Sequence, residues 1–270
     1  MSTSTETRHQ PDVAPSSPLR IVVLDATNWG HMLWHAARGE VDLPTALLSR
    51  CELLTRCWGA YRAIACFDQG ESFRKGLATD YKAQRAATDP SLRAGLDAAA
   101  SRLPREGIPV LAGDGLEADD WIASVCRAAL DCGGQAVIVS ADKDVRQCLV
   151  AGRVSIANAV HIRRGVPEVR WLTAGLLREQ YGVRPEQWID YQALVGDRCD
   201  GIRGADGIGP KTAARLLAMA GSLERLLVAP DGYTANRREL AALRDFRERS
   251  ALVRRLVTLR TDGPFAADVL

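Results

Sequence analysis

The sequence predicts an α/β fold with a mostly parallel central sheet, followed by a smaller helical region. Short apolar runs alternate with amphipathic segments over roughly the first 150 residues, as they do when helices connect the strands of a parallel sheet. After about residue 170, the segments bounded by Gly and Pro all have a helical pattern. Residues 1–18 are polar, rich in Ser and Pro and without an apolar signal segment, so we expect a disordered tail.

Four buried strands are expected, with the sequences RIVVLD, AIACFD, IPVLAG and AVIVSADKD. Each run is short and mostly apolar, as the central strands of parallel sheets are. Helical patterns cover residues 43–58, 90–103 and 117–131. No apolar stretch approaches the roughly 18 residues that a membrane span needs.

Acidic residues follow all four expected strands. They are Asp25, Asp68, the three acids of LEADD (Glu117, Asp119 and Asp120), and Asp142 with Asp144. A single acid after a strand is more often a turn residue or a helix cap. The carboxyl ends of parallel strands, however, meet at one edge of the sheet, where ligands bind. Acids after all four strands therefore predict a metal site at that edge.

The donor types indicate which metal to expect. Carboxylates as close together as those of LEADD repel one another unless a cation lies between them, and oxygen ligands suit Mg²⁺ or Mn²⁺. The seven cysteines include no C-x-x-C pair, which disfavours zinc and indicates reduced thiols in a cytoplasmic protein. His31 and His35 are four residues apart and are an alternative metal pair, although helix periodicity also explains their spacing.

The segment VGDRCDGIRGADGIGPKTAARLL adds Asp197 and Asp200 ahead of a glycine-rich turn. It is not a Walker A loop, because Pro210 separates Gly209 from Lys211, and it lacks the strand and third glycine of a dinucleotide-binding fingerprint. Glycines, a helix N-terminus and a lysine together suit a phosphate group. We expect a hairpin that holds nucleic-acid backbone without reading bases; a plain interhelical turn is the alternative.

A second basic segment, SFRKGLATDYKAQR, covers residues 72–85 and interleaves basic with aromatic side chains. Such a pattern suits a nucleic-acid strand whose phosphates are neutralised and whose bases stack, although a solvated helix face can show it too. The formal net charge is only +2. If the nine acids named above bind cations, 24 acidic side chains remain against 35 basic ones, an excess that attracts a polyanion.

Four segments resemble, in order and spacing, the 5′ nuclease family of 5′–3′ exonucleases and flap endonucleases, which includes the 5′ nuclease domain of bacterial family-A DNA polymerases. They are FDQGESFRKGLATDYKAQR, LEADDWIASV, VSADKDVRQCL and VGDRCDGIRGADGIGPKTAARLL. The resemblance implies a PIN-like core over residues 19–172, which includes a helical arch at about residues 72–105. A helix-three-turn-helix subdomain over residues 173–270 would bind duplex DNA.

The resemblance also assigns roles to residues. Two or more Mg²⁺ ions, or Mn²⁺, would bind at two clusters: Asp25, Asp68, Glu117, Asp119 and Asp120 in one, and Asp142, Asp144, Asp197 and Asp200 in the other. Catalytic roles fall on Lys82, Arg85, Asp119 and Asp142. DNA contacts fall on Arg74, Tyr81, Lys82, Arg85, Gly204, Gly207, Gly209, Lys211 and Thr212. The hairpin that carries Lys211 would also hold K⁺.

The implied activity is that of a monomeric, metal-dependent structure-specific 5′ nuclease in replication and repair. Its substrates would be DNA with a 5′ flap, fork, nick or free 5′ end, and RNA primer strands; no membrane is involved. Two alternatives remain open: a DNA-binding protein of this fold without turnover, and a PIN-like ribonuclease. Four positions depart from the family pattern, namely Met32, Ala141, Arg203 and Asp206, and Asp206 would lie close to a bound phosphate.

Overall fold

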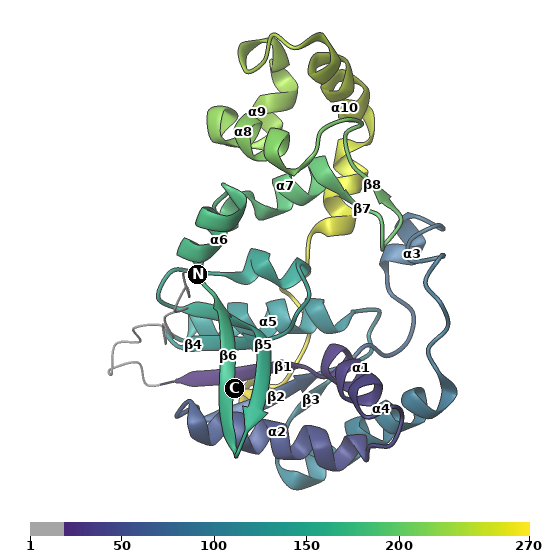
Figure 1. The fold of residues 1–270 in the computed structure, drawn as a ribbon, viewed down its shortest axis with the longest axis vertical. Helices are drawn as coiled ribbons and strands as arrows, with labels where there is room; N and C mark the ends of the chain where they lie inside the picture. The colour runs from purple at the N-terminus through teal and green to yellow at the C-terminus, as the bar shows by residue number, and fades with distance from the viewer. Residues whose placement is uncertain (1–18) are drawn as a thin grey trace, which may run out of the picture.

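The computed structural model describes residues 19–270, and the expected tail at residues 1–18 lies outside the described residues. A six-stranded sheet with the order β3-β2-β1-β4-β5-β6 forms its centre (Figure 1). All neighbouring strands are parallel except β5 and β6, which confirms the mostly parallel sheet. The strands are β1 (Arg20–Asp25), β2 (Arg62–Cys66), β3 (Val110–Leu111), β4 (Gln135–Val139), β5 (Val154–Arg163) and β6 (Val166–Leu172).

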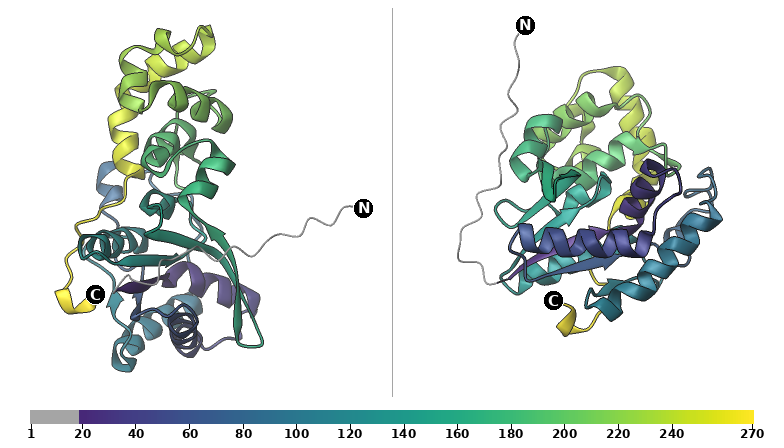
Figure 2. Two further views of the ribbon diagram at one scale, coloured as in Figure 1. Left: turned by 90° about the vertical axis from the view of Figure 1, so that its left-hand side faces the viewer. Right: turned by 60° about the horizontal axis from the view of Figure 1, so that its bottom comes forward.

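Helices cover both faces of the sheet, so its central strands are buried on both sides. On one face lie α1 (Ala26–Ala36), α2 (Leu43–Cys57) and α4 (Pro90–Arg102), and on the other lies α5 (Ala118–Asp131) (Figures 1 and 2). In β1, Val22 and Leu24 belong to the apolar cluster of the first face, whereas Ile21 and Val23 belong to that of the second. This double burial explains why the strands read as unbroken apolar runs.

The hairpin of β5 and β6 was not predicted from the sequence. Beyond the sheet centre its side chains alternate between half-buried and exposed, so no apolar run marks it. The sequence feature that marks it is the Arg164-Gly165 pair at the turn, where the two φ angles are 50° and 76°. Two successive left-handed residues are typical of a tight hairpin turn.

The helical region confirms the expected change of pattern. It contains α6 (Ala174–Tyr181), α7 (Trp188–Val195), α8 (Pro210–Ala220), α9 (Leu223–Val228), α10 (Arg237–Val257) and the small strands β7 (Gly196–Asp197) and β8 (Ile202–Arg203). The glycine-rich hairpin lies between α7 and α8, as predicted. Among residues 19–270, no helix is long and apolar enough to cross a membrane.

After α10 the chain returns to the core instead of staying with the helical region (Figure 2). The Arg260 amide donates to Asp120 at 2.8 Å, and the Gly263 amide donates to Ser124 at 2.9 Å. Further along, Arg62 donates to the carbonyl of Asp268 at 2.7 Å. Residues 258–270, which the sequence placed with the helical subdomain, therefore contact the α/β core.

The segment expected to form an arch begins with the short helix α3 (Arg74–Leu77) and ends in α4. Residues 78–89 between them contain turns and no helix. Leu92, Leu96 and Ala99 fix α4 against the core. The part of this segment that lies outside α3 and α4 is therefore residues 78–89.

Gly204 is needed for the close approach of two backbone segments in the hairpin. A Cβ atom there would overlap the Leu194 carbonyl oxygen and the Gly196 amide nitrogen, neither of which can rotate away. We expect Gly204→Ala to lower the free energy of unfolding by about 2 kcal/mol or more, measured by urea denaturation. The control is Gly209→Ala, because φ there is −85° and an added Cβ atom would have no non-neighbouring atom within 4 Å. This substitution should change the free energy of unfolding by less than about 0.5 kcal/mol. Equal effects of the two substitutions would contradict this account.

Candidate active site

The acids expected at the sheet edge converge there. In the sheet β1 lies between β2 and β4, so Asp25 at the end of β1 has Asp68 on one side and Asp142 on the other. Two groups of carboxylates each have ligand oxygens within 4.8 Å of one another: Asp119, Asp142 and Asp144, and then Asp144, Asp197 and Asp200. Asp144 belongs to both groups. The division differs from the expected one, because Asp119 joins Asp142 and Asp144.

Burial and mutual repulsion perturb the protonation of these acids. Burial raises the pKa of Asp25 to about 7, although Ser140 and Asn28 donate hydrogen bonds that lower it. Burial, followed by the charge of Asp142, raises the pKa of Asp144 to about 7. The pKa of Asp119 is also raised, through burial and then the charges of its neighbours. Oxygen donors held together against their own repulsion form a set that fits a hard divalent cation.

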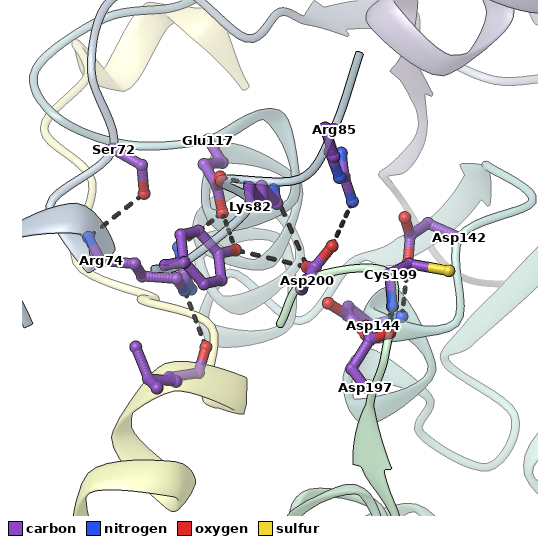
Figure 3. A network of polar contacts seen from close by, with 12 residues as sticks. Ser72, Arg74, Lys82, Arg85, Glu117, Asp142, Asp144, Asp197, Cys199 and Asp200 are labelled. Carbon is purple, nitrogen blue, oxygen red and sulfur yellow. Dashed lines mark hydrogen bonds and ion pairs between the residues drawn. The ribbon is translucent and has the colours of Figure 1, made fainter. Parts of the chain in front are cut away.

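Arg74 provides a buried positive charge near Glu117 (Figure 3). Its guanidinium makes two 2.7 Å hydrogen bonds to Asp120 and one of 2.9 Å to Glu117. It also donates to the carbonyls of Leu256 at 2.9 Å and Thr258 at 3.0 Å. The Arg74 side chain is 1% exposed and that of Asp120 is 0% exposed. Arg74 therefore cannot contact DNA as expected, and Asp120 is its partner instead of lying in either carboxylate group.

Tyr81 also differs from its expected role. Its side chain is buried, and its hydroxyl donates to Glu117 at 2.9 Å. The ring is therefore not available for a base to stack on. Tyr81 instead fixes Glu117 from below the surface.

Lys82, Arg85 and Lys143 are the cations that border the carboxylate groups. Lys82 lies 2.5 Å from Glu117 and Arg85 pairs with Asp200 (Figure 3). Lys143 lies 2.5 Å from Asp197. Sequence reasoning missed Lys143, although its place between two acids in SADKD was a signal. The backbone of Lys82 is left-handed, with φ of 55°, and its amide donates to the Asp200 carbonyl at 3.0 Å.

The hairpin forms an open groove of about 900 Å³. Gly207 and Gly209 are exposed along it, and Gly204 is buried in its wall. Just beyond it, at the start of α8, Lys211 is exposed and Thr212 is half-buried. The first amides of α8 have no side-chain cap, so they are available to an anion. Gln84 and Arg198 also line the groove and were not predicted.

The remaining positions singled out in the sequence belong to neither carboxylate group. Met32 is 41% exposed on α1, and Ala141 is exposed next to Asp142. The His31 and His35 rings are 6.2 Å apart and belong to neither carboxylate group. The seven cysteines are free thiols.

The buried ion pair predicts a large effect of one substitution. Arg74→Met keeps the side-chain length but leaves the buried Asp120 without its cation, which costs about 3–5 kcal/mol of unfolding free energy when a buried pair is broken. The control is Arg260→Met, because Arg260 is 46% exposed and pairs with Asp262 at the surface; its cost should stay below about 1 kcal/mol. Urea denaturation measures both. A cost for Arg74→Met as small as that of the control would show that the buried pair does not stabilise the fold.

Comparison with known proteins supports these assignments at the level of the family. The model of the 5′–3′ exonuclease N-terminal resolvase-like domain matches residues 20–182, and that of the C-terminal SAM fold matches residues 183–269. A flap endonuclease Xni of Aeromonas salmonicida is 34% identical over 255 residues, covering 90% of this chain and 92% of that protein. The thermostable DNA polymerase I of Thermus thermophilus is 37% identical over 206 residues, covering 76% of this chain and 24% of that protein.

Solved structures share the fold. T5 5′-exonuclease with bound zinc matches with a TM-score of 0.72 and 22% identity, over 88% of each chain. The catalytic core of Rad2 in complex with DNA substrate matches with a TM-score of 0.56 and 18% identity, over 92% of this chain and 82% of that one. Because the two family models together span residues 20–269, this chain belongs to the 5′–3′ exonuclease family.

Proposed function

We propose that this protein is a divalent-metal-dependent, structure-specific 5′ nuclease that hydrolyses phosphodiester bonds near 5′ flaps, forks, nicks and free 5′ ends of DNA. The observation that carries the proposal is the pair of carboxylate groups that share Asp144 and face the cations Lys82 and Arg85. Metal ions for the chemistry and cations for the scissile phosphate would thus meet at one place. The relatives named flap endonuclease and DNA polymerase I support the same substrate class.

The donor set favours Mg²⁺, or Mn²⁺, over zinc. Each group offers carboxylate oxygens only, whereas zinc sites in proteins are built mainly from Cys and His. Asp119, Asp142, Asp144, Asp197 and Asp200 would hold two ions. Asp25, Asp68 and Glu117 would contribute through their charge and through bound water. Two such ions, when bound, supply an activated water and stabilise the leaving oxygen of a phosphodiester.

Lys82 and Arg85 would act on the phosphate itself. They border a cavity of about 170 Å³ that Asp68 and Glu117 also line. A phosphate entering this cavity would compete with Glu117 for Lys82 and with Asp200 for Arg85. The two cations would then offset the negative charge that develops on the phosphate in the transition state. The left-handed backbone at Lys82 is of the strained kind found at functional sites, and its hydrogen bond to Asp200 places the side chain beside the acids.

The duplex part of the substrate would lie in the hairpin groove. Gly207 and Gly209 leave the backbone open to a phosphate, α8 presents free amides, and Lys211 adds a positive charge. Contacts of this kind position a duplex without reading its sequence. Recognition would therefore depend on the structure of the DNA and not on its bases.

Cleavage of a 5′-labelled, 5′-flapped duplex tests the proposal directly. Wild-type protein should cut near the junction with Mg²⁺ and not with EDTA. Asp142→Ala should lower the rate by about a hundredfold or more, because it removes a carboxylate ligand of the metal ions that would act on the phosphate. The matched control is Asp131→Ala, which removes an exposed acid at the far end of α5 and should leave the rate unchanged. Tight binding of the flap without product under Mg²⁺ or Mn²⁺ would contradict the enzyme. Preferential cutting of an RNA flap would instead indicate a ribonuclease.

Metal binding should release protons near neutral pH. The pKa values of Asp25 and Asp144 are raised from 3.8 to about 7, so at pH 6 both acids are largely protonated in the metal-free protein. The free energy of unfolding of the metal-free protein falls as pH rises from 3.8 to about 7, because the folded protein disfavours the ionised forms of Asp25 and Asp144. Bound Mg²⁺ favours the ionised acids and so reverses this effect.

Calorimetric Mg²⁺ titrations in buffers of different ionisation enthalpy measure the protons released. Mg²⁺ binding should release protons at pH 6 and fewer protons at pH 8. At pH 6, Asp144→Asn should release fewer protons than the wild type. Mg²⁺ binding at pH 6 with no proton release would show that these acids do not take part.

A further inference from the structure

Arg249 connects the last long helix to the glycine-rich hairpin. Its guanidinium donates to the carbonyl oxygen of Arg203 and to that of Gly204, each at 2.7 Å. The two acceptors are consecutive in the chain, so one side chain holds both carbonyls of a single turn. The Phe246 ring lies 5.0 Å from the guanidinium, and the Arg249 side chain is only 27% exposed. The cation is thus held in place and does not extend freely into solvent.

The same guanidinium belongs to a group of charges at the hairpin. Arg203 pairs with Asp206 through two hydrogen bonds, and Arg249 lies 4.0 Å from Asp206 and 3.7 Å from Asp245. Asp206 therefore has a cation on each side. Its negative charge is neutralised within the protein, which removes the conflict with an approaching phosphate.

These contacts do not fit the potassium ion that the family resemblance implies for this hairpin. A potassium ion would need several carbonyl oxygens of the turn, but those of Arg203 and Gly204 already accept from a full positive charge. A second cation beside the guanidinium would be repelled by it. The hairpin already contains a cation of its own.

We propose that Arg249 is a built-in substitute for a bound monovalent cation: it holds the hairpin carbonyls in place for duplex binding, so that this protein binds DNA without a potassium requirement. The proposal rests on the proposed function, since it assumes that the hairpin binds duplex. The proposal also explains Arg203 and Asp206, which are two departures from the family pattern. Asp206 helps to orient the Arg249 guanidinium, and Arg203 offsets the negative charge of Asp206.

Duplex binding in two salts tests this assignment. A fluorescein-labelled blunt duplex is titrated by anisotropy, with EDTA present, in potassium chloride and in tetramethylammonium chloride of equal ionic strength. The Kd of the wild type should agree within about twofold between the salts, because the electrostatic contribution is held constant. Arg249→Met, which keeps the length and removes the charge and donors, should bind at least about fivefold more tightly in potassium, a coupling of ordinary size. Arg244→Met, on the same helix but paired only with Asp231 at the surface, should behave as the wild type.

Hydrogen exchange of the amides in residues 203–209 provides a readout that needs no DNA. Exchange in the wild type should be the same in both salts, whereas in Arg249→Met it should be faster and be slowed by potassium. Wild-type exchange or binding that depends on potassium would overturn the assignment, and so would an Arg249→Met protein that matches the wild type in both salts. Salt-independent exchange in the wild type and potassium-dependent exchange in Arg249→Met, with no duplex binding in either salt, would support the assignment and count against the proposed function.

Discussion

The repulsion among carboxylates at the end of β1 is the constraint to which the rest of this structure responds. Parallel strands bring Asp25, Asp68 and Asp142 to one edge, and Glu117 and Asp119 join them from the start of α5. Without cations, such a cluster can persist only by taking up protons, as the raised pKa values of Asp25 and Asp144 show. A fold that keeps these acids together although it disfavours their ionisation is consistent with a metal-binding site.

The cations around the cluster differ in how permanently they are held. Arg74 is fully enclosed and shares its hydrogen bonds between two carboxylates and two carbonyls, so it belongs to the fold. Lys82 and Arg85 lie at the surface of the cluster with side chains 21% and 50% exposed, so a phosphate can draw them away. Solvent access thus separates a structural counterion, Arg74, from the two cations that we propose to act on the phosphate.

The sequence was informative where a local pattern decides the structure. Strands ending in acids and a glycine-rich turn followed by Pro and Lys were enough to predict the sheet edge, the carboxylate site and the hairpin. Arg74 could not be separated from its basic neighbours, because its burial depends on Leu256 and Thr258, which lie 182 and 184 residues away. The β5–β6 hairpin was missed because it is largely exposed, and Arg249 because its acceptors are backbone carbonyls that no sequence pattern displays.

The return of the chain after α10 has a consequence for how this protein is made. Arg74 and Asp120 are synthesised early, but the carbonyl of Thr258 and the amide of Arg260 that complete their environment are available only about 140 residues after Asp120. Contacts this distant in sequence form late and slow the folding of a chain. The N-terminal segment up to residue 182 would therefore emerge from the ribosome with its acidic cluster incomplete. Although separate family models match its two halves, the nascent protein must wait for both before it can assemble an active site.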